Sequence, residues 1–170
     1  MSSYPTVIAT SVIRSAQQGE SHGGVYLVDL NSGTYRNVID WDDESISWEG
    51  RGGDRGLRGV AFHDGLVYLA ASDEVFVYDR DFKRIGSIVN KHLIYCHEVF
   101  IYENTLYLTS TRYDSILLYN LDENTFRRGL CFSAEILVQE QKDYHRCRGV
   151  DVECFPGDAR NSSVKREGQA

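Results

Sequence analysis

The hydrophobic positions of this chain fall in short runs bounded by turn residues. Representative runs are Val25–Leu30, Leu66–Ala71 and Ile116–Tyr119. Runs of this length, rich in Val, Ile, Leu and Tyr and flanked by Asn, Asp, Ser and Gly, are typical of β-strands joined by tight turns. The segments between them are too short for a crossover helix, so neighbouring strands are expected to be antiparallel. The pattern predicts an all-β protein.

The runs gather into three groups of strands. The first group has three strands, and the second and third groups have four each. The predicted ranges are Thr6–Ile13, Val25–Leu30 and Thr34–Trp41 for the first group, residues 59–90 for the second and residues 98–132 for the third. Asn31-Ser32-Gly33 is predicted to be a hairpin turn, in which glycine supplies a positive φ.

A strand-turn-strand motif recurs at a spacing of about forty residues. Val60–Leu69 aligns with Val99–Leu108, with apolar residues on apolar residues and Tyr68 on Tyr107. The next strands continue the match. Short strands repeated at this period are typical of the blades of a β-propeller. We therefore expect Tyr68 and Tyr107 to be equivalent in adjacent sheets.

The strands are apolar on both faces, which indicates stacked sheets. Leu66–Ala71 and Ile116–Tyr119 lack the polar alternation that a sheet with one wet face should show. Strands that are buried on both sides and joined by tight hairpins fit sheets packed face to face. A β-sandwich, in which each sheet would expose one face, is the structural alternative.

The three groups do not begin in phase. The first group aligns from the second strand of a unit onward, and Arg148–Val152 resembles the opening strand of a further unit. The predicted fold is thus an all-β propeller of about three four-stranded antiparallel blades in an incomplete ring, covering residues 1–155. Residues 156–170 are polar and are predicted to be a disordered tail. The chain is either a fragment of a larger propeller, which we favour, or half of a six-bladed ring of two copies.

Two motifs carry a resemblance to known proteins. GVAFHDGLVYLAAS (residues 59–72) and EVFIYENTLYLTST (residues 98–111), with the VFVYD and ILLYN strands that follow, are similar to blades of the broad six-bladed class that includes the regucalcin/gluconolactonase-like, NHL-repeat and TolB-like proteins. The resemblance implies a fold. In the lactonases of this class Glu, Asp and Asn side chains hold a divalent cation in the central channel. Here only Glu98 lies at a suitable place, and one carboxylate is not a metal site.

Four polar residues recur at the openings of the innermost strands. They are Arg58, His97, Glu98 and Arg148. Such positions line one mouth of the central channel in a propeller, so we expect a partly cationic site for a carboxylate or phosphate group. In the alternative interpretation, Glu98 pairs with a neighbouring arginine and only caps the channel.

Composition narrows the classes of partner. The chain has 170 residues and a net charge of −7. This charge argues against non-specific binding to nucleic acid and to anionic membranes. No apolar run is long enough to cross a bilayer, and the N-terminus lacks a basic leader followed by an apolar stretch, so a cytoplasmic location is expected. None of the four cysteines forms a C-x-x-C pair, and all are expected to be reduced.

These features favour a non-enzymatic binding or scaffold propeller with its ligand site at the channel mouth. The expected partner is a small anionic ligand or a protein, and open blade edges are expected to favour self-association. The alternative is a propeller hydrolase or lactonase that uses a divalent metal in the channel. Nothing in the sequence identifies a cofactor.

Overall fold

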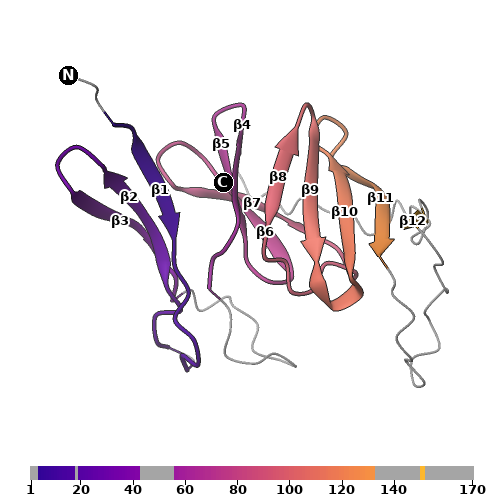
Figure 1. The fold of residues 1–170 in the computed structure, drawn as a ribbon, viewed down its shortest axis with the longest axis horizontal. Helices are drawn as coiled ribbons and strands as arrows, with labels where there is room; N and C mark the ends of the chain where they lie inside the picture. The colour runs from indigo at the N-terminus through magenta and orange to yellow at the C-terminus, as the bar shows by residue number, and fades with distance from the viewer. Residues whose placement is uncertain (1–3, 18, 43–55, 133–149, 152–170) are drawn as a thin grey trace, which may run out of the picture.

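The computed structural model describes residues 4–17, 19–42, 56–132 and 150–151, and this part of the chain is all-β. Three antiparallel sheets follow one another along the sequence and lie side by side, with the sheet of residues 60–89 between the other two (Figure 1). No helix within these ranges is long and apolar enough to cross a lipid bilayer. The predicted all-β class and the antiparallel strand pairing are confirmed.

Three strands form the first sheet, in the order β1 (Thr6–Thr10), β2 (Gly24–Asp29) and β3 (Thr34–Asp40). The hairpin between β2 and β3 contains Gly33, whose φ is +70°. The Asp29 carboxylate accepts a hydrogen bond from the backbone N–H of Asn31 (2.8 Å), which is the main reason that the pKa of Asp29 lies below its ordinary value. The predicted turn at residues 31–33 is therefore present and is stabilised by this aspartate.

Four strands form the second sheet, in the order β4 (Val60–His63), β5 (Leu66–Ala70), β6 (Glu74–Tyr78) and β7 (Arg84–Val89). The β4–β5 hairpin turns at Asp64 and Gly65, which have φ values of +48° and +75°. Two consecutive positive φ values give a type I′ turn, whose twist matches that of the flanking strands. The Asp-Gly pair therefore fixes the register of this hairpin.

Five strands form the third sheet, in the spatial order β12 (Val150–Asp151), β11 (Thr125–Phe132), β10 (Ser115–Asn120), β9 (Thr105–Ser110) and β8 (Val99–Tyr102). A 3-10 turn, Thr111–Tyr113, joins β9 to β10. As in the second sheet, the first four strands in sequence are each paired with the next one along the chain.

The position of β12 corrects one prediction. Val150–Asp151 was expected to lie in the innermost strand of a further unit. Instead, Asp151 pairs with Cys131 and Val150 with Phe132, so β12 extends the third sheet beyond β11. An outer strand presents unpaired backbone groups, and a short extended segment can satisfy them wherever the chain returns to that edge. The sequence of β12 resembles that of an inner strand, but this similarity did not determine which strand it pairs with.

The strand register confirms the forty-residue repeat. Tyr68 and Tyr107 occupy the same register between their neighbouring strands, in β5 and β9 respectively. Val67 and Leu106, the residues before them, are both buried. The prediction that these positions are equivalent in adjacent sheets is therefore correct.

Two hydrophobic clusters hold the three sheets together. The cluster between the first and second sheets contains Val25, Trp41, Leu57, Val67, Leu69, Ala71, Phe76 and Tyr78. The cluster between the second and third sheets includes Ala61, Tyr68, Val75, Val77, Val99, Leu106, Leu108, Leu117 and Tyr119. The second sheet therefore has apolar neighbours on both faces, as the stacked arrangement predicts.

Candidate functional site

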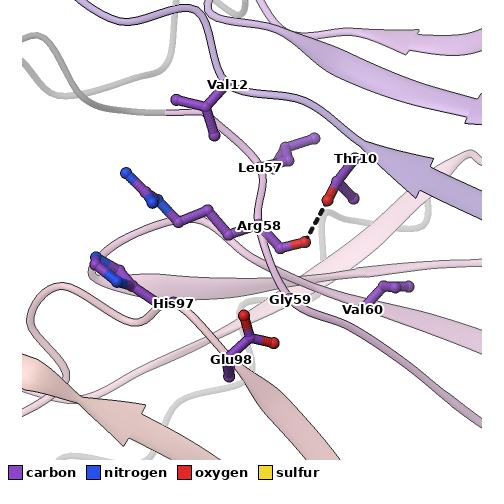
Figure 2. A pocket seen from close by; sticks show the side chains of 8 residues that line it. All are labelled: Thr10, Val12, Leu57, Arg58, Gly59, Val60, His97 and Glu98. Carbon is purple, nitrogen blue, oxygen red and sulfur yellow. Dashed lines mark hydrogen bonds between the residues drawn. The ribbon is translucent and has the colours of Figure 1, made fainter.

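A pocket of about 480 Å³ lies where the three sheets approach one another at the start of the inner strands (Figure 2). Strand β1 and the segment directly after it contribute Thr10 and Val12. The chain entering the second sheet contributes residues 57–60, and the chain entering the third sheet contributes His97 and Glu98. Three of the four predicted site residues, Arg58, His97 and Glu98, thus line one pocket. The fourth, Arg148, lies outside the described residues.

Two hydrogen bonds between the sheets hold the residues around this pocket together. The Thr10 hydroxyl donates a hydrogen bond to the Arg58 carbonyl (2.6 Å), which ties the first sheet to the second (Figure 2). The Gly59 N–H donates to the His97 carbonyl (2.8 Å), which ties the second sheet to the third. These two bonds bring residues from all three sheets around the same hollow.

Gly59 makes this close approach possible. A Cβ atom at this position would lie 2.7 Å from the Cα of Glu98 and from the backbone nitrogen of Val99. Both neighbours are backbone atoms, which cannot rotate away as a flexible side chain could. Any larger residue at position 59 would therefore separate the two inner strands and open the pocket.

Thr109 on β9 holds the His97–Glu98 segment in place. Its hydroxyl oxygen accepts from the N–H groups of His97 (3.2 Å) and Glu98 (3.0 Å) and donates to the Glu98 carbonyl (3.2 Å). The backbone that carries both side chains is thus fixed by a residue of the neighbouring strand. Their side chains leave the strand from a defined position at the pocket rim.

The charged and polar side chains of the pocket differ in direction and exposure. Arg58 and His97 extend toward the same side of the pocket, whereas the Glu98 carboxylate points toward Gly59, directly before β4 (Figure 2). Arg58 and His97 are half-buried, and Glu98 is exposed. A half-buried guanidinium can form two parallel hydrogen bonds to a carboxylate or phosphate, and it remains charged at any physiological pH.

Cys96, directly before this segment, has a structural role. Its side chain is fully buried, and its thiol lies 3.7 Å from the Glu98 carbonyl. Burial raises the pKa of Cys96 to about 12, so the thiol stays protonated and unreactive near neutral pH. Among the described residues Cys96 is a free thiol, and Cys131 on β11 is also buried. Cys147 and Cys154 lie outside the described residues, and the reduced state expected for them stays a prediction.

Sequence reasoning missed three residues that shape the pocket, namely Thr10, Gly59 and Thr109. Thr10 and Thr109 fall at the same place when the motifs Ala9-Thr10-Ser11 and Leu108-Thr109-Ser110 are aligned. This recurrence of a threonine hydroxyl beside an inner strand could have indicated from the sequence that both residues shape the pocket. The need for glycine at position 59 depends on a contact between sheets, which no local pattern reveals.

No group of three or more His, Cys, Asp or Glu side chains that could hold a metal ion occurs among the described residues. Comparison of the chain with protein-family models, with curated proteins and with solved structures finds no significant match. The interpretation of the pocket therefore depends on its own geometry and chemistry.

Proposed function

We propose that the three sheets are blades of an incomplete β-propeller and that the chain is a non-enzymatic binding protein. Its ligand is a small anion with a carboxylate or phosphate group, held in the pocket at the start of the inner strands. The observation that carries this proposal is that Arg58 and His97, two potential donors from neighbouring sheets, line one pocket of about 480 Å³. Pockets with a few convergent polar groups are where small ligands usually bind.

Each pocket residue has a distinct part in this proposal. Arg58 supplies the permanent positive charge and the paired donors that match the oxygens of the anion. His97 supplies a ring N–H from the third sheet. Glu98 opposes a bound anion by charge, and it limits the affinity of the pocket for ligands with several negative charges.

The alternative function, a hydrolase or lactonase with a metal in the channel, needs more oxygen ligands around Glu98. A protein site dedicated to such a cation supplies several oxygen ligands, as in the six to eight oxygens that surround Ca²⁺. The described residues hold no such group. The structure offers this alternative no specific support.

Isothermal titration of the full chain with inorganic phosphate, and separately with succinate, tests the proposal. Arg58→Gln is expected to weaken binding about tenfold or more, because it removes a charge-assisted pair of hydrogen bonds. Glu98→Gln is expected to strengthen binding about fivefold, because it removes a like charge from the rim. Arg80→Gln serves as the control, since Arg80 is an exposed arginine next to Gly65 in the β4–β5 turn.

The three variants should keep the unfolding temperature of the wild type. Absence of measurable binding of either anion to the wild type, or equal affinity of the Arg58→Gln and wild-type proteins, would contradict the proposal. A gain of affinity on addition of Mg²⁺ or Ca²⁺ alone would favour the metal-dependent alternative.

A further inference from the structure

The two ends of the row of sheets carry apolar faces that are partly exposed. On the third sheet the side chains that point away from the second sheet form one continuous surface. The apolar residues of this third-sheet outer face are Phe100, Tyr107, Ile116, Leu118, Leu130 and Phe132. By strand alternation and register they share the face with Thr109 and Arg128. Phe100 is 64% exposed and Phe132 is 48% exposed. Contiguous exposed apolar surface of this kind marks an interaction site.

The first sheet carries a second surface of this kind at the opposite end of the row. This first-sheet outer face consists of Val7, Ala9, Tyr26, Val28 and Tyr35. Tyr35 is 72% exposed, and its ring contacts that of Tyr26 edge to face, with 6.0 Å between centroids. Ile8, which alternates with Val7 and Ala9, packs instead into the cluster between the first and second sheets.

The forty-residue repeat indicates which kind of surface packs against the third-sheet outer face. Its positions are equivalent to those that the second sheet buries against the third. Tyr107 corresponds to Tyr68, and Leu118 corresponds to Val77, by the strand register. Tyr68 and Val77 both belong to the cluster between the second and third sheets. The third-sheet outer face is therefore one half of a sheet-on-sheet contact that already occurs within the chain.

The first-sheet outer face is the other half of the same contact. By register, Ala9 corresponds to Leu108 and Tyr26 corresponds to Leu117. Leu108 and Leu117 are the residues with which the third sheet packs against the second. Among the residues that the structure describes, the same pair of faces is thus stacked twice, and one copy of each face is left at the two ends of the row of sheets (Figure 1).

The two complementary outer faces favour the ring of two copies over the fragment that the sequence alone favours. We propose that a second copy of this chain docks head to tail, with its first-sheet outer face on the third-sheet outer face of its partner. The contact is heterologous, because the two surfaces are different. Two chains of three sheets each give six sheets, which lies within the four to eight blades typical of closed propellers. The pair then closes on itself and forms the same contact twice.

The expected interface is large enough for a stable pair. Three or four strands spaced about 4.8 Å apart and about 20 Å long give each outer face an area of roughly 300–400 Å². Two contacts with two faces each bury on the order of 1,200–1,600 Å², which is the range of specific protein–protein interfaces. The third-sheet outer face also has a hollow of about 450 Å³ beside Ile116 and Phe132, which offers room for side chains to interdigitate.

Sedimentation velocity of the full chain over a range of concentrations tests this proposal. The wild type is expected to form a particle of twice 19.3 kDa. Tyr107→Arg and Tyr26→Arg, each on one outer face, are expected to raise the concentration needed for association at least a hundredfold. Ile85→Arg is the control, since Ile85 is an exposed apolar residue of β7 in the second sheet and belongs to neither outer face.

Mixing the two arginine variants gives the decisive result. Tyr107→Arg retains an intact first-sheet outer face, and Tyr26→Arg retains an intact third-sheet outer face. An equimolar mixture is therefore expected to form a two-chain complex that neither variant forms alone. Far-ultraviolet circular dichroism checks that both variants fold, and Leu118→Gln provides a second, milder change on the third-sheet outer face. A wild type that stays monomeric at high concentration would overturn the proposal. So would dissociation by Tyr107→Arg with no effect of Tyr26→Arg, because that result indicates a contact between two third sheets.

Discussion

The second and third sheets carry the same repeat but bury it differently. In β5 four consecutive residues, 67–70, are buried, whereas β9 alternates between buried and half-buried positions along its length. Within the described residues, the second sheet has a neighbour on each face and the third sheet packs on one. Burial at equivalent positions is therefore set by what the chain places next to the sheet, and the apolar outer side of β9 indicates a contact that the described chain does not make.

The largest expected effect of this difference in burial is at the equivalent tyrosines, Tyr68 and Tyr107. Tyr68→Ala is expected to lower the free energy of unfolding by about 3–5 kcal/mol, because it empties a site packed between two sheets. Tyr107→Ala, at a half-buried site, is expected to cost about 1 kcal/mol in the monomeric chain. Urea denaturation at low protein concentration gives both values. Equal losses would show that the outer side of β9 is covered within a single chain.

Val67 and Leu106 precede these tyrosines and point to the other face of their sheets. They sharpen the comparison, because that face is buried in both the second and the third sheet. Leu106→Ala is expected to cost about 2–5 kcal/mol, and Val67→Ala, which removes fewer atoms, about 1–3 kcal/mol. Both side chains are buried, at 0% and 5% exposure. The same denaturation experiment applies. A loss below about 0.5 kcal/mol for Leu106→Ala would contradict the packing of the third sheet on the second.

The segment between β7 and β8, which connects the second sheet to the third, is expected to have a smaller, pH-dependent effect on the free energy of unfolding. Burial first, and then the charge of Lys91, lower the pKa of His92. The unfolded chain therefore binds a proton at His92 more readily than the folded chain does. This contribution to stability is complete above the ordinary histidine pKa and is lost as the pH falls through it.

Stability is accordingly expected to decrease between about pH 7.5 and pH 5.5. His92→Gln should flatten this part of the profile, and Lys91→Gln should reduce its slope by less. Urea midpoints at both pH values provide the measurement. A steeper decrease in His92→Gln than in the wild type would reverse the sign and refute this assignment.

Local patterns were sufficient for the strands and for their register. The Asp64-Gly65 turn and the apolar runs around it specify the β4–β5 hairpin without help from the rest of the chain. The same holds for the match between Tyr68 and Tyr107, since the β4–β5 and β8–β9 turns both have two residues and give the same register. These features depend on residues that are close in sequence, so the sequence alone predicted them.

Contacts between sheets could not be predicted in this way. β12 pairs with the edge of β11 although its sequence resembles an inner strand. Tyr107 is half-buried although its sequence motif matches that of the buried Tyr68. For the pocket, the shared strand position predicted that Arg58, His97 and Glu98 meet. The links that hold the pocket, from Thr10 and Gly59, connect residues on different sheets and become visible only in three dimensions.

Hydroxyl-radical footprinting of the full chain at several concentrations tests most directly whether a neighbouring sheet decides burial. At low concentration Tyr107 and Phe100 should be modified readily while Tyr68 stays protected. At high concentration the protection of Tyr107 should approach that of Tyr68, because a second copy then covers the third sheet. Equal protection of Tyr68 and Tyr107 at every concentration would contradict the account, since both faces of the third sheet would then be covered within one chain.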